Sequence, residues 1–233
     1  MAHRVVRNAC ATLAVFGCLH LTTACRLWSQ PNDDTASLKV VVSTIDRTLW
    51  VLRGTDTLRT AQVAVGSGMD LSYAGRQWAF ATPRGDFRVL DKRRDPVWVP
   101  PDWMYAEVAR EHHFDLRHLT ARGETLLDGT RLVIRDSIVG LVSDSGTFNP
   151  LPLDEHIVFD GILFIPPLNT QNRHVHGELG AYALDLGRGY MLHGTPDQTS
   201  IGTASTHGCI RLRDDDLSWL FEHVAIGTPV VIQ

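Results

Sequence analysis

The chain has 233 residues, of which 44% are hydrophobic and 21% are charged, and its formal net charge at pH 7 is −4. This is the composition of an ordinary globular protein with one large domain or two small ones. The acidic balance excludes a protein that binds nucleic acid through a basic surface.

Residues 1–25 have the features of a secretory signal peptide. Arg4 and Arg7 precede a mostly apolar run at 9–21, and that run is too short to span a bilayer as a helix. Small residues follow at 22–24, as expected before a cleavage site. We therefore predict an exported protein that is located in the periplasm or the cell envelope.

The end of this segment, LTTAC, resembles a bacterial lipobox, in which the cysteine becomes the lipid-modified first residue of the mature protein. We predict that Cys25 is lipidated and anchors the protein to a membrane. Cleavage after Ala24 by ordinary signal peptidase, which would leave a free N-terminal cysteine, is the alternative.

Beyond Cys25, the exported part would contain a single cysteine. Residues 1–25 hold two arginines, no acids and three of the four cysteines, so their removal leaves 20 basic and 26 acidic residues and a net charge of −6. Cys209 then has no partner for an intramolecular disulfide. An unpaired thiol is a chemical liability in an oxidising compartment, and a catalytic thiolate is one of the few reasons to keep one.

Strands dominate the first third of the remaining chain. Residues 26–37 are polar and turn-prone and predict a tether. Apolar and β-branched runs predict strands at 38–45, 47–54, 57–66 and 85–90. Residues 95–103 contain too many prolines for a central strand. Residues 104–177 give weaker signals, and we predict an irregular insertion of strands and loops with one helix at 103–114.

The C-terminal part is clearer. Residues 181–186 and 189–194 predict two strands around a glycine-rich turn. Residues 214–224 predict a helix, because the apolar residues Leu217, Leu220, Phe221 and Val224 fall on one face. Residues 228–233 predict a closing strand. The whole exported part, 38–233, is therefore predicted to be mainly β with one or two short helices.

The segment STHGCIRL, at 205–212, places Cys209 two residues after a histidine. A thiol with an ordinary pKa of about 8.5 needs a base to attack at neutral pH. Both His193, at the end of a predicted strand, and His207 are candidates to take the proton or to form an ion pair with the thiolate. Arg211 would favour the thiolate if it lay close to it.

Gly208 predicts a bend in this segment that lets backbone N–H groups approach a substrate carbonyl. Donors near Gly208 and Cys209 could then form an oxyanion hole, in which each donor contributes about 3–4 kcal/mol. Two other interpretations of Cys209 remain open at this point. It could be a buried structural thiol, or a zinc ligand in a set made from His174, His176, His193, His207 and Cys209.

A family resemblance rests on these residues. HGT at 193–195 and STHGCIRL closely resemble the signature of bacterial L,D-transpeptidases with a YkuD-type catalytic domain. TPRGDF at 82–87, PVWVPP at 96–101 and the segments 179–195 and 214–232 are also similar to that family. The resemblance covers residues 38–103 and 178–232. One departure is Thr206, where serine is usual in the family, so the hydroxyl is kept and a methyl is added.

The resemblance implies a YkuD-like β-sandwich and a set of roles. Cys209 would be the nucleophile, His193 would accept and donate the proton, and His207 would be a third catalytic residue. The oxyanion and substrate pocket would be shaped by Thr206, Gly208 and Arg211, together with Gly194. No cofactor and no metal is implied.

The implied reaction is peptidoglycan cross-linking. The thiol would attack the carbonyl of the third residue of a tetrapeptide stem, release the terminal D-alanine and form a thioester. An amine acceptor, usually a diaminopimelate side chain on a neighbouring stem, would resolve that thioester. Two alternatives are an L,D-carboxypeptidase or hydrolase, in which water is the acceptor, and a non-catalytic wall-binding lipoprotein.

Overall fold

The computed structural model describes residues 37–233. The predicted signal peptide with Cys25 and residues 26–36 of the predicted tether lie outside the described residues. Within 37–233, neither helix has the length and apolar character needed to cross a membrane.

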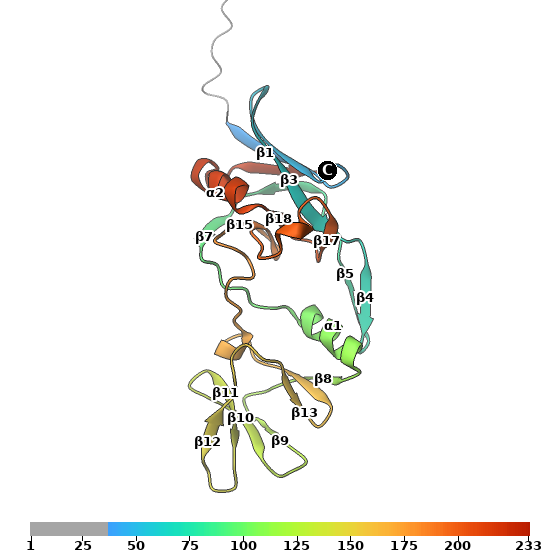
Figure 1. Cartoon of the computed structure of the whole chain (residues 1–233), viewed down its shortest axis with the longest axis vertical. Helices are drawn as coiled ribbons and strands as arrows, with labels where there is room; N and C mark the ends of the chain where they lie inside the picture. The colour runs from blue at the N-terminus through green and yellow to red at the C-terminus, as the bar shows by residue number, and fades with distance from the viewer. Residues whose placement is uncertain (1–36) are drawn as a thin grey trace, which may run out of the picture. The chain divides into compact units, whose positions relative to one another are not determined.

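Ten strands form one connected sheet (Figure 1). They are β1 (Leu38–Ser43), β2 (Thr48–Arg53), β3 (Asp56–Gly66), β6 (Gly85–Arg88), β7 (Asp91–Arg94), β15 (Tyr182–Gly187), β16 (Tyr190–His193), β17 (Ala204–Thr206), β18 (Ile210–Leu212) and β19 (Pro229–Ile232). The main path runs β6-β19-β1-β2-β3-β18-β16-β15-β7, and β17 pairs with β3.

Strands from the two halves of this path share one hydrophobic core. Val42 from β1 and Leu49 from β2 lie in the same buried cluster as Leu192 from β16 and Leu212 from β18. Alternation along each strand explains this arrangement, because every second side chain points to the same face. The fold is mainly β and sandwich-like, as predicted.

Helix α2 (Asp214–His223) covers this core beside β15. Its buried residues are Leu217 and Leu220, both on the apolar face that the sequence predicts. Three aspartates occupy the first turn, where the positive end of the helix dipole favours acids. The closing strand β19 then pairs in parallel with β1, which joins the two ends of the described chain.

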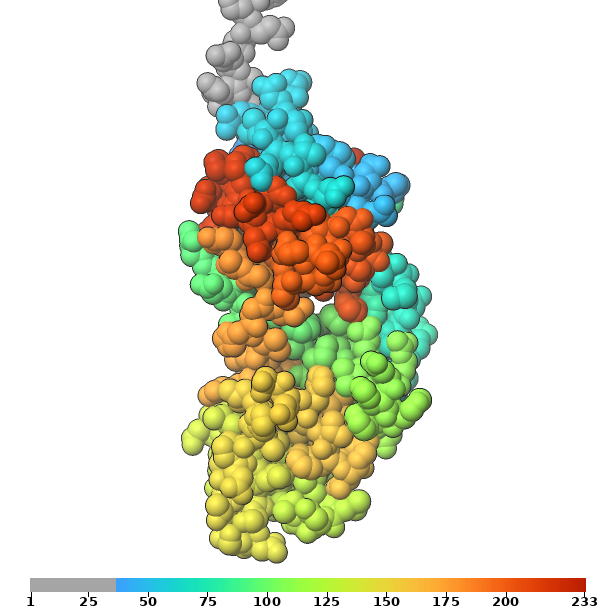
Figure 2. Space-filling view, viewed as in Figure 1, coloured from blue at the N-terminus to red at the C-terminus, as the bar shows by residue number. Residues whose placement is uncertain are grey.

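Residues 102–175, which we call the insert, lie outside the ten-stranded sheet. The insert begins with α1 (Asp102–His112) and continues in two small sheets. One sheet contains β9 (Glu124–Thr125), β10 (Arg131–Arg135), β11 (Ile138–Val142) and β12 (Phe148–Pro150). The other contains β8 (Asp115–His118), β13 (Ile157–Phe159) and β14 (Ile162–Ile165). In Figure 2 the yellow-green and yellow residues of these sheets form a continuous surface of their own.

The insert is closed at its base by backbone pairing. Trp98 and Val175 exchange two hydrogen bonds, with N···O distances of 2.9 and 2.8 Å. The buried guanidinium of Arg173 donates to the carbonyl oxygens of Pro100 and Pro166 at 2.8 and 2.7 Å. It also pairs with Asp102 at 3.0 Å, so the beginning of the insert is joined to a residue near its end.

A further hairpin, β4 (Asp70–Tyr73) and β5 (Arg76–Ala79), was not predicted from the sequence. It packs against α1 through Leu71, which lies in one buried cluster with Phe80 and Ala106. This cluster fixes the position of α1 relative to the β4–β5 hairpin.

Candidate active site

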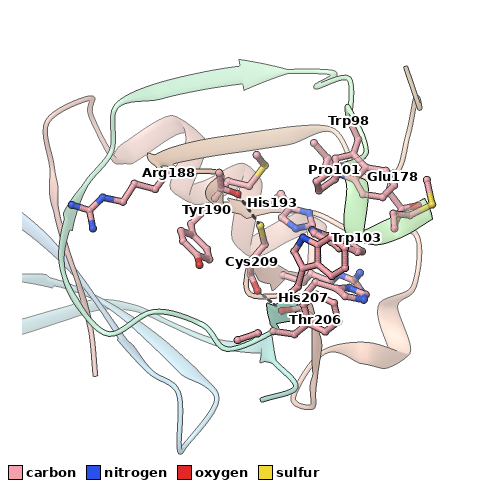
Figure 3. A pocket seen from close by; sticks show the side chains of 18 of the residues that line it. Trp98, Pro101, Trp103, Glu178, Arg188, Tyr190, His193, Thr206, His207 and Cys209 are labelled. Carbon is pink, nitrogen blue, oxygen red and sulfur yellow. Dashed lines mark hydrogen bonds between the residues drawn. The ribbon is translucent and has the colours of Figure 1, made fainter. Parts of the chain in front are cut away.

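A cavity of about 610 Å³ lies between the sheet and α1 (Figure 3). Its lining includes five of the predicted site residues, which are His193, Thr206, His207, Cys209 and Arg211. The two predicted glycines, Gly194 and Gly208, are not part of this lining. Their backbone carbonyl groups instead accept hydrogen bonds, that of Gly194 from His193 and that of Gly208 from Thr82.

The pairing of two parallel strands presents the cysteine and the first histidine to this cavity. In β16 and β18, Leu192 lies opposite Ile210 and His193 lies opposite Arg211. Side chains two apart on a strand share a face, so Cys209, just before β18, is on the face of Arg211 and therefore of His193. The opposite face carries Leu192 and Ile210 into the core.

His193 is buried and its tautomer is fixed by the backbone. The residue is 5% exposed, and Nδ1 lies 2.6 Å from the carbonyl oxygen of Gly194. Because a carbonyl can only accept, Nδ1 carries the hydrogen and Nε2 keeps its lone pair. Burial lowers the pKa of His193 to about 4, and the Arg211 charge acts in the same direction. The imidazole is therefore neutral at pH 7.

Gly194 makes this arrangement possible through close backbone packing. A side chain at Gly194 would place its Cβ 3.0 Å from the Cα of Gly180 and 3.2 Å from a carboxylate oxygen of Asp214. A larger residue would push the carbonyl that holds His193 away from its ring.

The thiol of Cys209 is half-buried and rests in its protonated form. Burial raises the pKa of Cys209, although the Met191 backbone N–H and the Arg211 charge both act to lower it. The thiol donates to the carbonyl oxygen of Gly189 at 3.6 Å. The expectation that Arg211 favours the thiolate is thus right in direction, but burial outweighs it.

The loop that carries the cysteine is held by two threonine hydroxyls. Thr206 Oγ1 donates to the Cys209 carbonyl at 2.6 Å and accepts from the Gly208 N–H at 3.1 Å. Thr82 Oγ1 donates to the Gly208 carbonyl at 2.9 Å and accepts from the Gly66 N–H at 2.7 Å. The Gly208 N–H therefore has a hydrogen-bond partner inside the loop, and the oxyanion role expected of donors near Gly208 and Cys209 stays a prediction.

Gly208 has the backbone conformation that its bend requires. Its φ is +120°, and a Cβ there would lie 3.0 Å from a ring carbon of Tyr190. Both the conformation and the close approach need glycine. Tyr190 and Arg188 line the cavity near the cysteine, and sequence reasoning did not select either of them.

The second histidine, His207, faces the insert. Its ring stacks on Trp103 of α1, with centroids 4.0 Å apart and 14° between the planes. Its Nε2 lies 2.9 Å from a carboxylate oxygen of Glu107, on the same helix. Glu107 was not predicted as a site residue, because no pattern in the sequence connects it to His207, 100 positions away.

The residues of the alternative zinc site do not come together. His174 and His176 are absent from the cavity lining that holds His193, His207 and Cys209. In the part of the chain that the structure describes, no three His, Cys, Asp or Glu side chains are placed to share a metal ion.

Comparison with known proteins assigns the family. The family model described as the YkuD L,D-transpeptidase catalytic domain matches residues 37–232. The chain therefore belongs to the L,D-transpeptidase family with a YkuD-type catalytic domain.

Individual relatives either have modest sequence identity to this chain or match only a short part of it. The probable L,D-transpeptidase ErfK/SrfK of Salmonella typhimurium is 28% identical over 201 residues, which cover 85% of this chain and 45% of that protein. The probable L,D-transpeptidase YbiS of Escherichia coli is 50% identical over 52 residues, which cover 22% of this chain and 17% of that protein. The chain thus spans less than half the length of these curated relatives.

Among solved structures, an L,D-transpeptidase from Xylanimonas cellulosilytica is similar to this chain. The sequence identity is 16% and the TM-score is 0.44, and the match covers 85% of this chain and 61% of that one.

Proposed function

We propose that the protein is an exported cysteine L,D-transpeptidase that acts on peptidoglycan tetrapeptide stems. One observation carries this proposal: the Cys209 thiol shares a cavity with a buried, neutral His193 whose Nδ1 is bound to a backbone carbonyl. Nε2 is then the ring atom left to take a proton from the thiol.

The reaction begins from the neutral pair. As Sγ of Cys209 attacks the carbonyl carbon of the third stem residue, His193 Nε2 takes the thiol proton. The tetrahedral intermediate collapses when the bond to the terminal D-alanine breaks, and the imidazolium gives its proton to the departing amine. The product is a thioester on Cys209 and free D-alanine, and His193 is neutral again.

The second half reverses the proton transfers. An acceptor amine attacks the thioester carbonyl, and His193 accepts the proton that the amine loses. The C–S bond then breaks and His193 returns the proton to Sγ, which regenerates the thiol and leaves a new amide cross-link. Throughout, the oxyanion is stabilised by the Cys209 backbone N–H and the Arg211 guanidinium, because the Gly208 N–H is bound to Thr206.

The resting state distinguishes this mechanism from one with a preformed ion pair. Burial disfavours both the thiolate of Cys209 and the imidazolium of His193, so the ion pair forms only during the attack. We expect no thiolate absorbance near 240 nm at pH 7 above that of Cys209→Ala. A clear thiolate band at pH 7 would contradict the neutral resting pair.

The test of the function is intact-protein mass spectrometry of residues 26–233 with a disaccharide-tetrapeptide. The wild type should gain an acyl mass, release D-alanine and form cross-linked dimers, and Cys209→Ala should do none of these. Trimmed stems without dimers would identify water as the acceptor. If neither protein reacts and Cys209→Ala leaves every cellular phenotype unchanged, the non-catalytic alternative holds.

A second test uses an inhibitor in place of the stem. We expect a carbapenem to acylate Cys209, with a mass increase in the wild type and none in Cys209→Ala. An unmodified wild-type mass after incubation would count against a reactive Cys209.

The anchoring proposal concerns Cys25. In cells that export the full chain, labelled palmitate should enter the wild type and not Cys25→Ala, and the wild type should sediment with membranes. Equal labelling of the two proteins would exclude Cys25 as the lipidated residue.

A further inference from the structure

The second histidine of the site is held on three sides by residues distant in sequence. Trp103 lies flat against the His207 ring at 4.0 Å, and the Phe80 ring meets it edge-on at 4.4 Å. A Glu107 carboxylate oxygen lies 2.9 Å from Nε2. Together these contacts restrict both the position of the ring and its rotation.

Two of these three contacts come from the insert. Trp103 and Glu107 are four residues apart on α1, so they lie on the same face of the helix. Ala106 is fully buried against Leu71 and Phe80. The helix is thus fixed by its own apolar packing, and the carboxylate is presented to His207 from a rigid support.

His207 is coupled to the nucleophile through a single glycine. The Gly208 carbonyl accepts a hydrogen bond from Thr82, and Tyr190 leaves no room for a side chain at this position. We therefore expect a displacement of His207 to be passed on to Cys209 through this short, constrained bend.

We propose that Glu107 is a positioning residue for the transpeptidase site, and that it acts by fixing the ring orientation and tautomer of His207. An ionised carboxylate only accepts, so His207 donates its Nε2 hydrogen to Glu107. The remaining ring nitrogen, Nδ1, is then free to act on the substrate side. By this contact, helix α1 becomes part of the active site rather than a distant cover.

The proposal rests on the proposed function, because it assigns Glu107 a role in Cys209 chemistry. Its test is a double-mutant cycle in which the rate of Cys209 acylation by a carbapenem is measured in wild type, Glu107→Ala, His207→Ala and the double variant. Glu107→Ala should react about tenfold more slowly, since a small displacement of a site residue lowers reactivity strongly. In the His207→Ala background the same change should have no further effect. Independent, multiplying effects would overturn the proposal.

Two matched variants separate positioning from simple loss of packing. Glu107→Gln keeps an oxygen that can accept from Nε2–H, and it should stay within about threefold of the wild-type rate. Glu111→Ala changes an exposed acid on the same helix and should leave the rate unchanged. If Glu107→Gln is as slow as Glu107→Ala, the hydrogen bond from a fixed tautomer is not what matters.

A spectroscopic measurement does not depend on Cys209 chemistry. The ¹⁵N shifts of the His207 ring in the unliganded protein should show the hydrogen on Nε2 in the wild type and a mixture of tautomers in Glu107→Ala. If acylation fails in every protein while these shifts differ as expected, the proposed function fails and the positioning contact stands. Identical shifts in the two proteins would overturn the contact itself.

Discussion

The ten-stranded sheet and the insert are stabilised in different ways. The sheet packs both halves of its strand order and α2 around one large core, which includes Val42, Leu192 and Leu217. The insert has two smaller clusters, one around Leu132 and Phe164 and the other around Tyr105 and Leu163. We therefore expect the sheet to unfold as one cooperative unit and the insert, with its separate small clusters, to open by itself.

The sheet and the insert also contribute different residues to the candidate active site. The proposed nucleophile, Cys209, and its proposed base, His193, lie on the segment that enters β18 and on β16, which are neighbours in the sheet order. The insert supplies Trp103 and Glu107, which contact His207. In the proposed mechanism the sheet therefore carries both reacting groups, and the insert acts on them through His207.

The largest expected effect tests whether the chemistry depends on the sheet alone. His193→Gln keeps a polar side chain but removes the base, so Cys209 acylation should slow by about 10³-fold. The rate of acylation by a carbapenem, followed by intact mass, measures this. A loss smaller than that of Glu107→Ala would show that the insert contributes more to reactivity than the sheet does.

Matched core truncations test the independence of the two regions. Leu212→Ala in the sheet and Leu132→Ala in the insert each remove a fully buried side chain, and each should cost about 3 kcal/mol locally. Amide hydrogen exchange should show lost protection throughout the sheet for Leu212→Ala. For Leu132→Ala the loss should be confined to residues 115–165. Equal loss across both regions for Leu132→Ala would mean that the molecule unfolds as one unit.

Acid should weaken the sheet through His193. Its folded pKa of about 4 lies below the unfolded value of 6.5, so the unfolded state takes up the proton first as the pH falls. The stability due to neutral burial is complete above pH 6.5 and is lost by pH 4, a decrease of about 3 kcal/mol. Urea unfolding at both pH values should show this decrease in the wild type but not in His193→Gln. An equal decrease in both proteins would assign the acid sensitivity to other groups.

The smallest expected effect concerns Thr206, in the loop that carries Cys209. Thr206→Val removes the hydroxyl that bonds the Cys209 carbonyl and the Gly208 N–H, which leaves two backbone groups without this partner. The free energy of unfolding should fall by about 1–3 kcal/mol and the acylation rate by about tenfold. Thr206→Ser keeps the hydroxyl and should match the wild type. If Thr206→Val is also unchanged, the loop is held by Thr82 alone.

The parts of the fold that local patterns determine were predictable. The hairpin of β1 and β2 follows from alternating valines and leucines around a turn near Asp46, and α2 follows from Leu217 and Leu220 on one face. The β4–β5 hairpin was missed because Ala74 and Gly75 occupy its turn, both with positive φ. Alanine is not a residue that marks such a turn in a sequence.

The candidate site likewise has a part that local sequence predicts and a part that it does not. His207, Cys209 and Arg211 lie within five residues, so their motif could be read directly. Glu107 and Thr82 reach the motif from 100 and 126 positions away, and no local pattern records such contacts. The protonation state of the Cys209 thiol could not be predicted from the sequence either. The direction of its pKa shift depends on how far burial outweighs the charge of Arg211.

The pairing of Trp98 with Val175 has a consequence for how this chain can vary in length. Because the two backbones are already joined at the base of the insert, residues added at its far turns, such as 127–129 or 144–146, would extend a loop whose ends are fixed. The entropy of closing a loop grows only slowly with its length. The far end of the insert is thus a place where evolution or a protein engineer can splice in new sequence. Helix α1 does not have this freedom, because its residues Trp103 and Glu107 contact the His207 ring.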